Sequence, residues 1–383
     1  MDVAVLAGGR SPEHEVSLAS TAQVLQHLDR RRWRVWPVYL DRDGGWWPAH
    51  SPLPEGGTWR PQDPTHSIGR QRPGGAIDWL IDHAHVQVVL PVLHGPFGED
   101  GTVQGLLELY DLPCVGSGCA ASAVAMDKLR TRQVLQSVGI PLAKAYEPRT
   151  PLAQADAAVE FAAMQRAIGT PAFVKVDASG STVGVQRVTS EAELAAFFDQ
   201  FRGRFRRWFA EQALLGEEIT VPVLGNTGEA LQPLPPVGIY PRVAKWFTQE
   251  AKYQVGGSEE LVPPRGWTPA QIAVVQELAV RCHEALVCDG MSRTDMIVTA
   301  DGPHVLETNT IPGMTRTSLL PQSAAAVGIG FPQLLDRLLE LALQRGATAR
   351  AAAAAAARAP GSGRAAPAPA SGSAADQAAG ACT

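Results

Sequence analysis

The sequence is poor in the features that mark secreted, membrane-spanning and nucleic-acid-binding proteins. Its 383 residues contain only five cysteines, an odd and scattered set without metal-ligand spacing, which fits thiols in a reducing compartment. No apolar run is long enough to span a bilayer, and the first residues lack the basic start and long apolar core of a signal peptide. The net charge of −5 gives no electrostatic argument for binding to nucleic acid or to an anionic membrane. We therefore expect a cytoplasmic protein with neither partner.

The remaining composition describes a globular chain. A hydrophobic content of 45% and a charged content of 19% give ample core for two or three domains. Strand patterns at 3–7, 34–40 and 86–93 alternate with a helical pattern, which predicts a parallel α/β sheet at the front. The first helix is expected to start at a serine cap, Ser17. Residues 43–75 are rich in Gly, Pro and Trp without periodicity, and we interpret them as a long surface insertion.

The later part of the chain carries further patterns of both kinds. Helices are predicted at 120–138 and 269–286, and strands at 173–176, 183–188 and 219–224. From Gly346 onward the chain is mostly Ala, Pro, Gly, Ser and Arg, so it can bury little apolar surface. We expect a disordered tail there, in which the alanine run 351–357 forms a helix only transiently.

The most informative segment is a predicted hairpin that turns at Ala300-Asp301-Gly302. Because side chains alternate along a strand, a three-residue loop places Asp295 opposite Glu307 and Arg293 opposite Asn309. Two carboxylates, an amide oxygen and a guanidinium then share one face. Three oxygen donors suit Mg²⁺, whose other positions take water and phosphate. The alternative is an ordinary solvated hairpin face.

A loop of small residues, 177–184, lies between two predicted strands. Its backbone N–H groups and hydroxyls, including that of Ser181, could approach a phosphate closely, although a plain hairpin turn is the alternative. Lys175 and Lys128 could supply counter-charges, or could be solvated surface lysines. The loop is no Walker A motif, since Gly-Lys-Ser/Thr does not follow.

Two acidic segments are further candidates. The connector 211–218 could offer backbone groups to a purine edge, with Glu218 on the ribose hydroxyls, or it could be an exposed acidic linker. At the first strand-to-helix turn, Glu15 suits the helix N-terminus. Glu13 is better placed to face a cleft at the carboxyl end of the strand, where α/β sheets bind ligands.

Two other polar segments have open interpretations. His94 sits in a glycine loop after the third strand, where it could orient an anion, transfer a proton or be a buried structural histidine. Lys252 and Tyr253 fall in a polar stretch, 248–260, that could be a mobile lid or simply pack.

Taken in order, these segments resemble D-alanine–D-alanine ligases of the ATP-grasp superfamily. The resemblance runs from about residue 1 to 345. It rests on Gly8-Gly-Arg-Ser-Pro-Glu-His-Glu-Val-Ser17, His94-Gly-Pro-Phe-Gly-Glu-Asp-Gly-Thr102, Val115-Gly-Ser-Gly118 with Ala125-Met-Asp-Lys128, Glu250-Ala-Lys-Tyr253 and Glu307-Thr-Asn-Thr-Ile-Pro-Gly-Met-Thr315. A NAD-linked dehydrogenase fits less well, because Gly8-Gly9 lacks the G-x-G-x-x-G spacing.

The resemblance implies an α/β, three-domain ATP-grasp architecture. Its domains would be an N-terminal α/β domain at 1–116, a central ATP-grasp subdomain at 117–210 and a C-terminal subdomain at 211–345, followed by the tail 346–383. ATP would be held between the central and C-terminal subdomains, with Mg²⁺ or Mn²⁺ at its phosphates and two D-alanine subsites beside it. The resemblance also implies a homodimer and a role in peptidoglycan precursor synthesis.

Residue roles follow from the same resemblance by motif match. Those at the amino-acid subsites and the reacting centre would be Glu13, Ser181, Tyr253, Arg293, Gly313 and Ser318. Those around ATP would be Lys128, Lys175, Glu211, Leu214, Glu218 and Lys252, and magnesium would be held by Asp295, Glu307 and Asn309.

The chain departs from the family pattern in two places. The phosphate loop reads Lys175-Val-Asp-Ala-Ser-Gly-Ser-Thr182 rather than Lys-Pro, a basic–acidic pair and Gly-Ser-Ser, and Gln212-Ala213 replaces a Lys–aromatic pair beside the adenine. These changes bear on ATP affinity and substrate choice. Two alternatives therefore stay beside the dipeptide ligase: a related ligase with D-serine, D-lactate or another acceptor, and a nucleotide-binding homologue without turnover.

Overall fold

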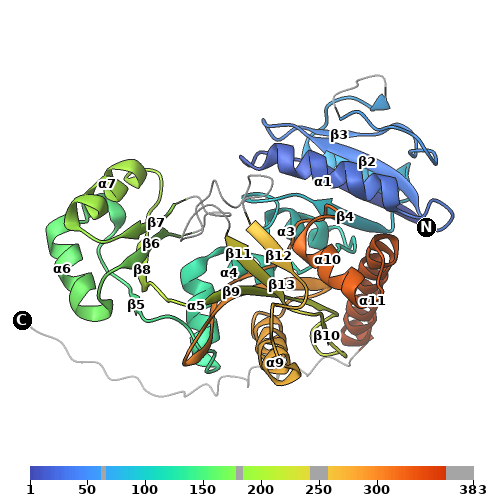
Figure 1. Cartoon of the computed structure of the whole chain (residues 1–383). Coiled ribbons are helices and arrows are strands. Elements are labelled where there is room, and N and C mark those ends of the chain that lie inside the picture. Colours follow the sequence, from blue (N-terminus) through green and yellow to red (C-terminus); the bar gives the residue numbers. More distant parts are fainter. Residues whose placement is uncertain (62–65, 178–183, 242–257, 359–383) are drawn as a thin grey trace, which may run out of the picture.

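The computed structural model describes residues 1–61, 66–177, 184–241 and 258–358, which form three sheets with helices around them (Figure 1). In Figure 1 the sheet that contains β6 lies on the left, the N-terminal sheet lies at the upper right, and the sheet that contains β13 lies between them. In the described residues no helix has the length and apolar character needed to cross a membrane. The four cysteines there are free thiols, and three of them are buried.

The N-terminal sheet has the order β3-β2-β1-β4. Strand β1 (Asp2–Gly8) pairs in parallel with β2 (Arg34–Leu40) and β4 (Val88–Val92), and helix α1 (His14–His27) connects β1 to β2. Every residue of β1 is buried, as expected for a parallel strand covered on both faces. The predicted parallel sheet is confirmed.

Two local predictions in this domain were wrong. Helix α1 begins at His14, so Ser17 lies inside it, where its hydroxyl accepts a hydrogen bond from the Gly8 N–H at 2.8 Å and donates to the Val92 carbonyl. The segment 43–75 is more than an insertion, because β3 (Trp46–Pro48) adds to β2 as an antiparallel edge strand and buries Trp46. An apolar Trp-Trp pair in a short strand carries too little periodicity to be recognised from sequence.

The central sheet is antiparallel, with the order β5-β8-β6-β7. Its strands are β5 (Ala145–Tyr146), β6 (Ala172–Val176), β7 (Val185–Val188) and β8 (Trp208–Gln212). A short 3₁₀ turn (Leu152–Gln154) and helices α6 (Ala157–Ile168) and α7 (Glu191–Phe201) pack on it. Phe197, Phe198 and Trp208 are fully buried in a core that belongs to this sheet alone.

The third sheet has the order β12-β11-β9-β13-β14, with β10 also paired to β9. Its strands are β9 (Glu217–Leu224), β10 (Gln232–Pro233), β11 (Val237–Pro241), β12 (Ser258–Leu261), β13 (Met291–Thr299) and β14 (Gly302–Asn309). Helix α9 (Pro269–Ala285) packs on it and starts with a capping box between Thr268 and Gln271. Helices α10 (Leu319–Ala326) and α11 (Phe331–Arg358) follow.

Helix α2 (Pro73–Asp82) lies between β3 and β4, and the helices after β4 join the first sheet to the second. After α3 (Thr102–Leu109), the single helix predicted at 120–138 is in fact two, α4 (Cys119–Met126) and α5 (Lys128–Ser137). The break falls at Asp127, whose carboxylate accepts a hydrogen bond from the Arg130 N–H at 3.1 Å. An aspartate at this position caps a new helix more favourably than it continues an old one.

One apolar core is shared by the N-terminal sheet and the third sheet. It contains Val5 of β1, Leu90 of β4, Met291 of β13 and Leu335 of α11, all at most 1% exposed. The apolar contacts therefore join the N-terminal sheet to the third sheet, while the central sheet has its own core.

The prediction of a disordered tail from residue 346 was wrong for the first part of that tail. Helix α11 continues to Arg358. Gly346 lies close to Pro113, since a Cβ on this glycine would be 2.6 Å from the proline Cγ. Alanine has the highest helix propensity, so the run after Gly346 extends a helix that is already anchored by packing. Residues 359–383 lie outside the described part of the chain.

Candidate active site

The hairpin of β13 and β14 carries the central patch of polar groups. Asp295 pairs with Glu307 and Arg293 with Asn309, so the predicted pairing is confirmed. The reason differs from the expected one, because Thr299 pairs with Gly302 and the loop has two residues. A bulge between Asp295 and Met296 supplies the missing residue and restores the register.

Each carboxylate of the patch has a cationic partner. Both nitrogens of the Arg293 fork lie 2.9 Å from Asp295, whose Oδ1 also accepts a hydrogen bond from Thr220 at 2.5 Å. Lys128 Nζ lies 2.7 Å from Glu307 Oε2, although the two residues are 179 positions apart. Burial lowers the pKa of Lys128, but the Glu307 carboxylate outweighs it and holds that pKa above its usual value.

The chemistry of the patch suits a divalent cation. Within the described ranges no group of three or more His, Cys, Asp or Glu side chains could hold a metal. The hairpin instead offers two facing carboxylates and the amide oxygen of Asn309, which accepts the Ile311 N–H at 2.9 Å and keeps a second lone pair. Oxygen ligands in this number fit Mg²⁺, which retains water and phosphate in its other positions. Arg293 and Lys128 lie beside these carboxylates and partly neutralise their charge.

A second buried cluster joins the central sheet to α5. Glu211 is 5% exposed, and its carboxylate contacts both Lys175 of β6 and Arg132, whose Nη1 lies 2.9 Å away. Lys175 and Glu211 were predicted separately, and the structure pairs them. Arg132 was missed, although it lies four residues after Lys128 on one helix, a spacing that places both cations on the same face.

The strand-to-strand connector after β8 carries the remaining nucleotide candidates. Leu214 is half-buried in this connector, and Glu218 is half-buried on β9, where it pairs with Ile239 and Ile297. The connector joins the central and third sheets, as the resemblance requires of a nucleotide-binding edge.

The N-terminal domain contributes the loop after β1. Glu13 occupies the cap position of α1 but makes no capping hydrogen bond. A Cβ on Gly95 would be 2.6 Å from its carboxylate, so the loops after β1 and β4 touch. Glu15 points away to solvent and pairs with Arg42 at 2.7 Å, which agrees with a helix-terminus role.

His94 proves to be buried. Its ring contacts Glu99 at 3.2 Å and Ser20 at 3.4 Å. Burial raises the pKa of Glu99, against the opposing hydrogen bond from His94, and Glu13 raises it further. Burial opposes the charged form of Arg293, but the Asp295 carboxylate outweighs it and keeps the Arg293 pKa above its usual range, with smaller contributions from Glu307 and Glu99.

The loop after β14 brings the last two candidates together. A Cβ on Gly313 would be 2.9 Å from Ser318 Oγ, and Ser318 is the cap residue of α10. Its hydroxyl accepts a hydrogen bond from the Thr315 N–H at 3.1 Å. The remaining predicted residues, Ser181, Lys252 and Tyr253, lie outside the described residues.

The comparison with protein families decides the relationship. The family models described as "D-ala D-ala ligase N-terminus" and "D-ala D-ala ligase C-terminus" match residues 2–117 and 134–340. The chain belongs to the D-alanine–D-alanine ligase family. Relatives named D-alanine–D-alanine ligase include one from Syntrophobacter fumaroxidans, 40% identical over 90% of this chain and 98% of its own length. Another, from Clostridium novyi, is 35% identical with the same coverage.

Solved structures of family members agree in fold. The D-alanine–D-alanine ligase from Coxiella burnetii superposes with a TM-score of 0.72 at 28% identity, over 93% of this chain and 97% of the other. The Bacillus anthracis ligase gives 0.72 at 29% identity over 91% and 99%. The same ligase complexed with ATP gives 0.69 at 28% identity with the same coverage. The chain thus has the ATP-grasp fold that its sequence resembles.

Proposed function

We propose that this protein is an ATP-dependent ligase that joins two D-alanines into D-alanyl-D-alanine for peptidoglycan precursors. Family membership along most of the chain supports this, as do relatives of that name at 35–40% identity. The observation that carries the proposal is the hairpin register, which places Asp295 opposite Glu307. Lys128 donates a hydrogen bond to the Glu307 carboxylate. A binding module has little need of facing carboxylates, a buried lysine and a guanidinium on one patch.

The reaction needs activation of a carboxylate. An oxygen of the first D-alanine carboxylate attacks the γ-phosphorus of ATP, ADP leaves, and an acyl phosphate forms. The amine of the second D-alanine then attacks the acyl carbon, loses a proton, and expels phosphate. The protein contributes chiefly by positioning the reactants and stabilising charge.

We assign the chain's residues to these tasks by motif match to the family. Glu13, at the β1 loop, would hold the ammonium of the first D-alanine. Arg293 and Ser318 would bind the carboxylate of the second, and the Gly313 N–H would face the developing oxyanion, with Ser181 and Tyr253 completing the subsites.

The nucleotide would lie between the central and third sheets. Lys128, Lys175 and Lys252 would contact its phosphates, and Glu211, Leu214 and Glu218 would surround the nucleoside. Asp295, Glu307 and Asn309 would hold Mg²⁺ or Mn²⁺, which supplies charge neutralisation at the phosphates. A family member solved in complex with ATP supports this nucleotide.

The decisive experiment is product analysis. Purified protein with D-alanine, Mg²⁺ and ATP is expected to release ADP and phosphate together with the dipeptide. ADP formed without a new peptide bond would overturn the proposal. The same assay with D-serine and D-lactate as acceptors identifies a specialised ligase, since lactate needs no amine deprotonation and its yield persists at lower pH.

We further propose a cytoplasmic homodimer. Size-exclusion chromatography with light scattering tests the dimer directly.

A further inference from the structure

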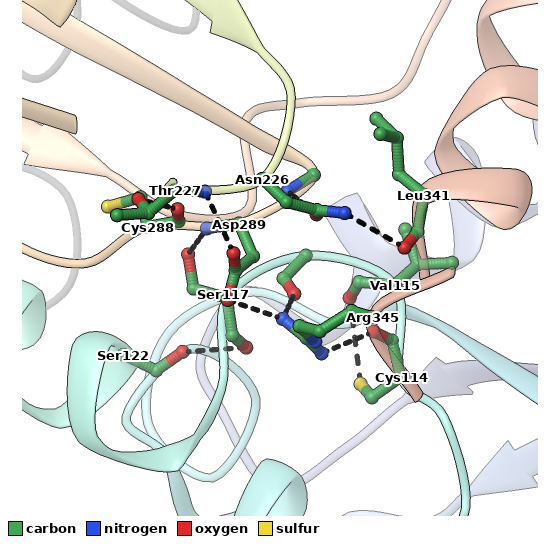
Figure 2. A network of polar contacts seen from close by, with 12 residues as sticks. Cys114, Val115, Ser117, Ser122, Asn226, Thr227, Cys288, Asp289, Leu341 and Arg345 are labelled. Carbon is green, nitrogen blue, oxygen red and sulfur yellow. Dashed lines mark hydrogen bonds and ion pairs between the residues drawn. The ribbon is translucent and has the colours of Figure 1, made fainter. Parts of the chain in front are cut away.

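One polar junction lies outside every group assigned above. Arg345 of α11 donates hydrogen bonds to the carbonyls of Cys114 at 2.8 Å and Gly116 at 2.6 Å, and pairs with Asp289 at 3.0 Å. Figure 2 shows Cys114 and Asp289 beside the Arg345 guanidinium. Its side chain is 25% exposed and that of Asp289 is 16% exposed, so water screens the pair only in part.

The two carbonyls belong to the segment that leaves the N-terminal domain. Val89 of β4 donates its N–H to Pro113 at 2.8 Å, and Val115 donates to Val89 at 2.8 Å. Residues 113–115 therefore run beside β4 as a parallel extension of the N-terminal sheet. A group held by Cys114 and Gly116 is thereby fixed to the domain that carries Glu13.

The carboxylate belongs to the other side of the junction. Asp289 accepts the Thr227 N–H at 3.1 Å and donates its own N–H to Ser117 at 3.2 Å. Gly290 donates to the Asn226 side chain at 3.1 Å. These bonds fix the turn that immediately precedes β13 (Figure 2).

Close backbone packing joins the two sides. A Cβ on Gly290, whose φ is +69°, would be 3.2 Å from the backbone N of Gly116. A Cβ on Gly116 would be 3.6 Å from the carbonyl oxygen of Thr310, the residue after Asn309. The start of β13 and the end of β14 thus both meet the domain linker at the point that Arg345 holds.

We propose that Arg345 is a positioning residue that fixes the catalytic hairpin relative to the N-terminal domain. The inference rests on the proposed function and adds a determinant to it. The shared apolar core and the Asp289–Ser117 hydrogen bond also join these parts, but apolar burial is non-directional and that bond is a single contact. A planar guanidinium with three fixed acceptors is directional. Arg345 thereby sets the separation between the first D-alanine subsite and the phosphate patch.

The test compares variants of the full-length chain. Arg345→Ala is expected to lower kcat/KM for D-alanine by about 10- to 100-fold, the effect of a misplacement of about 1 Å. Binding of a non-hydrolysable ATP analogue should not change, because the proposed nucleotide site lies between the central and third sheets. Arg345→Lys keeps a positive charge beside Asp289 but lacks the planar guanidinium group, so it should recover part of the loss.

Arg32→Ala is the matched control. Arg32 also links the N-terminal domain to α11, through ion pairs with Asp336 at 2.6 Å and with Glu340, but it contacts neither the linker nor the hairpin turn. Its removal should leave kcat/KM near the wild-type value. Equal losses in both variants would reduce Arg345 to a support of helix docking and overturn the proposal, as would an Arg345→Ala enzyme with wild-type kinetics or weakened nucleotide binding.

Hydrogen exchange tests the same inference without turnover. In Arg345→Ala the amides of residues 289–291 and 310–311, which lie beside the linker, should exchange faster, while those of β6 and β8 should not change. If that variant does not fold, Asp289→Asn, which keeps the acceptor for Thr227, should show the same local change. Unchanged exchange at the hairpin would overturn the inference even if the protein proved to ligate another substrate. A wild-type enzyme that forms no dipeptide would instead refute only the proposed function.

Discussion

Replacement of Glu307 by glutamine tests the hairpin patch most directly. The change keeps the shape of the side chain and removes one negative charge. Glu307 faces Asp295 across the strands and lies 2.7 Å from Lys128, whose side chain is only 11% exposed. The variant therefore removes the charge of one proposed metal ligand and also weakens the partner of a buried ammonium group.

Both effects can be given a size. Loss of charge stabilisation where phosphate is transferred should lower turnover on the order of 10²-fold, or about 3 kcal/mol in the barrier. A fully buried ion pair that loses one partner costs roughly 3–5 kcal/mol of folding free energy. Glu307 is 30% exposed and glutamine can still accept a hydrogen bond from Lys128, so we expect about 1–2 kcal/mol.

The assay follows ADP release over a Mg²⁺ titration, and urea unfolding gives the stability. Glu15→Gln is the control, because Glu15 is 75% exposed and forms an ion pair with Arg42 on the surface. It should change neither quantity appreciably. If Glu307→Gln turned over at the wild-type rate with the same Mg²⁺ dependence, the assignment of the hairpin face to the metal and phosphates would be refuted.

Further predictions concern the first substrate, the metal, pH and a helix cap. Glu13→Gln should raise KM for D-alanine at unchanged nucleotide affinity, measured by steady-state kinetics and calorimetry. Chelation of divalent cations should abolish turnover, and Mg²⁺ or Mn²⁺ should restore it. Burial lowers the pKa of His283 to about 4 from 6.5, so between these values the unfolded chain binds a proton that the folded chain does not. The free energy of unfolding should therefore fall as pH is lowered from 6.5 to 4, with a shallower slope in His283→Asn. Thr268→Ala removes a capping box and should cost about 1 kcal/mol, read from the urea midpoint.

Local chemistry was predictable from the chain alone. The alternation along residues 293–309 placed Asp295 and Glu307 on one face, and their predicted pairing is correct. The loop length was nevertheless wrong, and a bulge compensated for it. Family membership was also evident, since five motifs occur in the family's order.

Boundaries that depend on packing were less predictable. Composition alone predicted one helix where the chain breaks at Asp127. It also predicted disorder where α11 extends to Arg358. In the first, one side chain offers the backbone a better partner than the continuing helix does. In the second, a segment with few large apolar residues stays helical because the preceding turns are anchored.

Long-range partners were decided only by the tertiary structure. The hydrogen bond between Lys128 and Glu307 joins residues 179 positions apart, and the one between Arg345 and Cys114 joins residues 231 positions apart. Neither contact leaves a local pattern in the sequence. Sequence periodicity reports which face of an element is buried, but the groups that meet there depend on how separate elements pack. The residue types and their local spacing thus determined the candidate chemistry. The packing of α5 on β14 and the shared core of the first and third sheets decided which of those groups could act together.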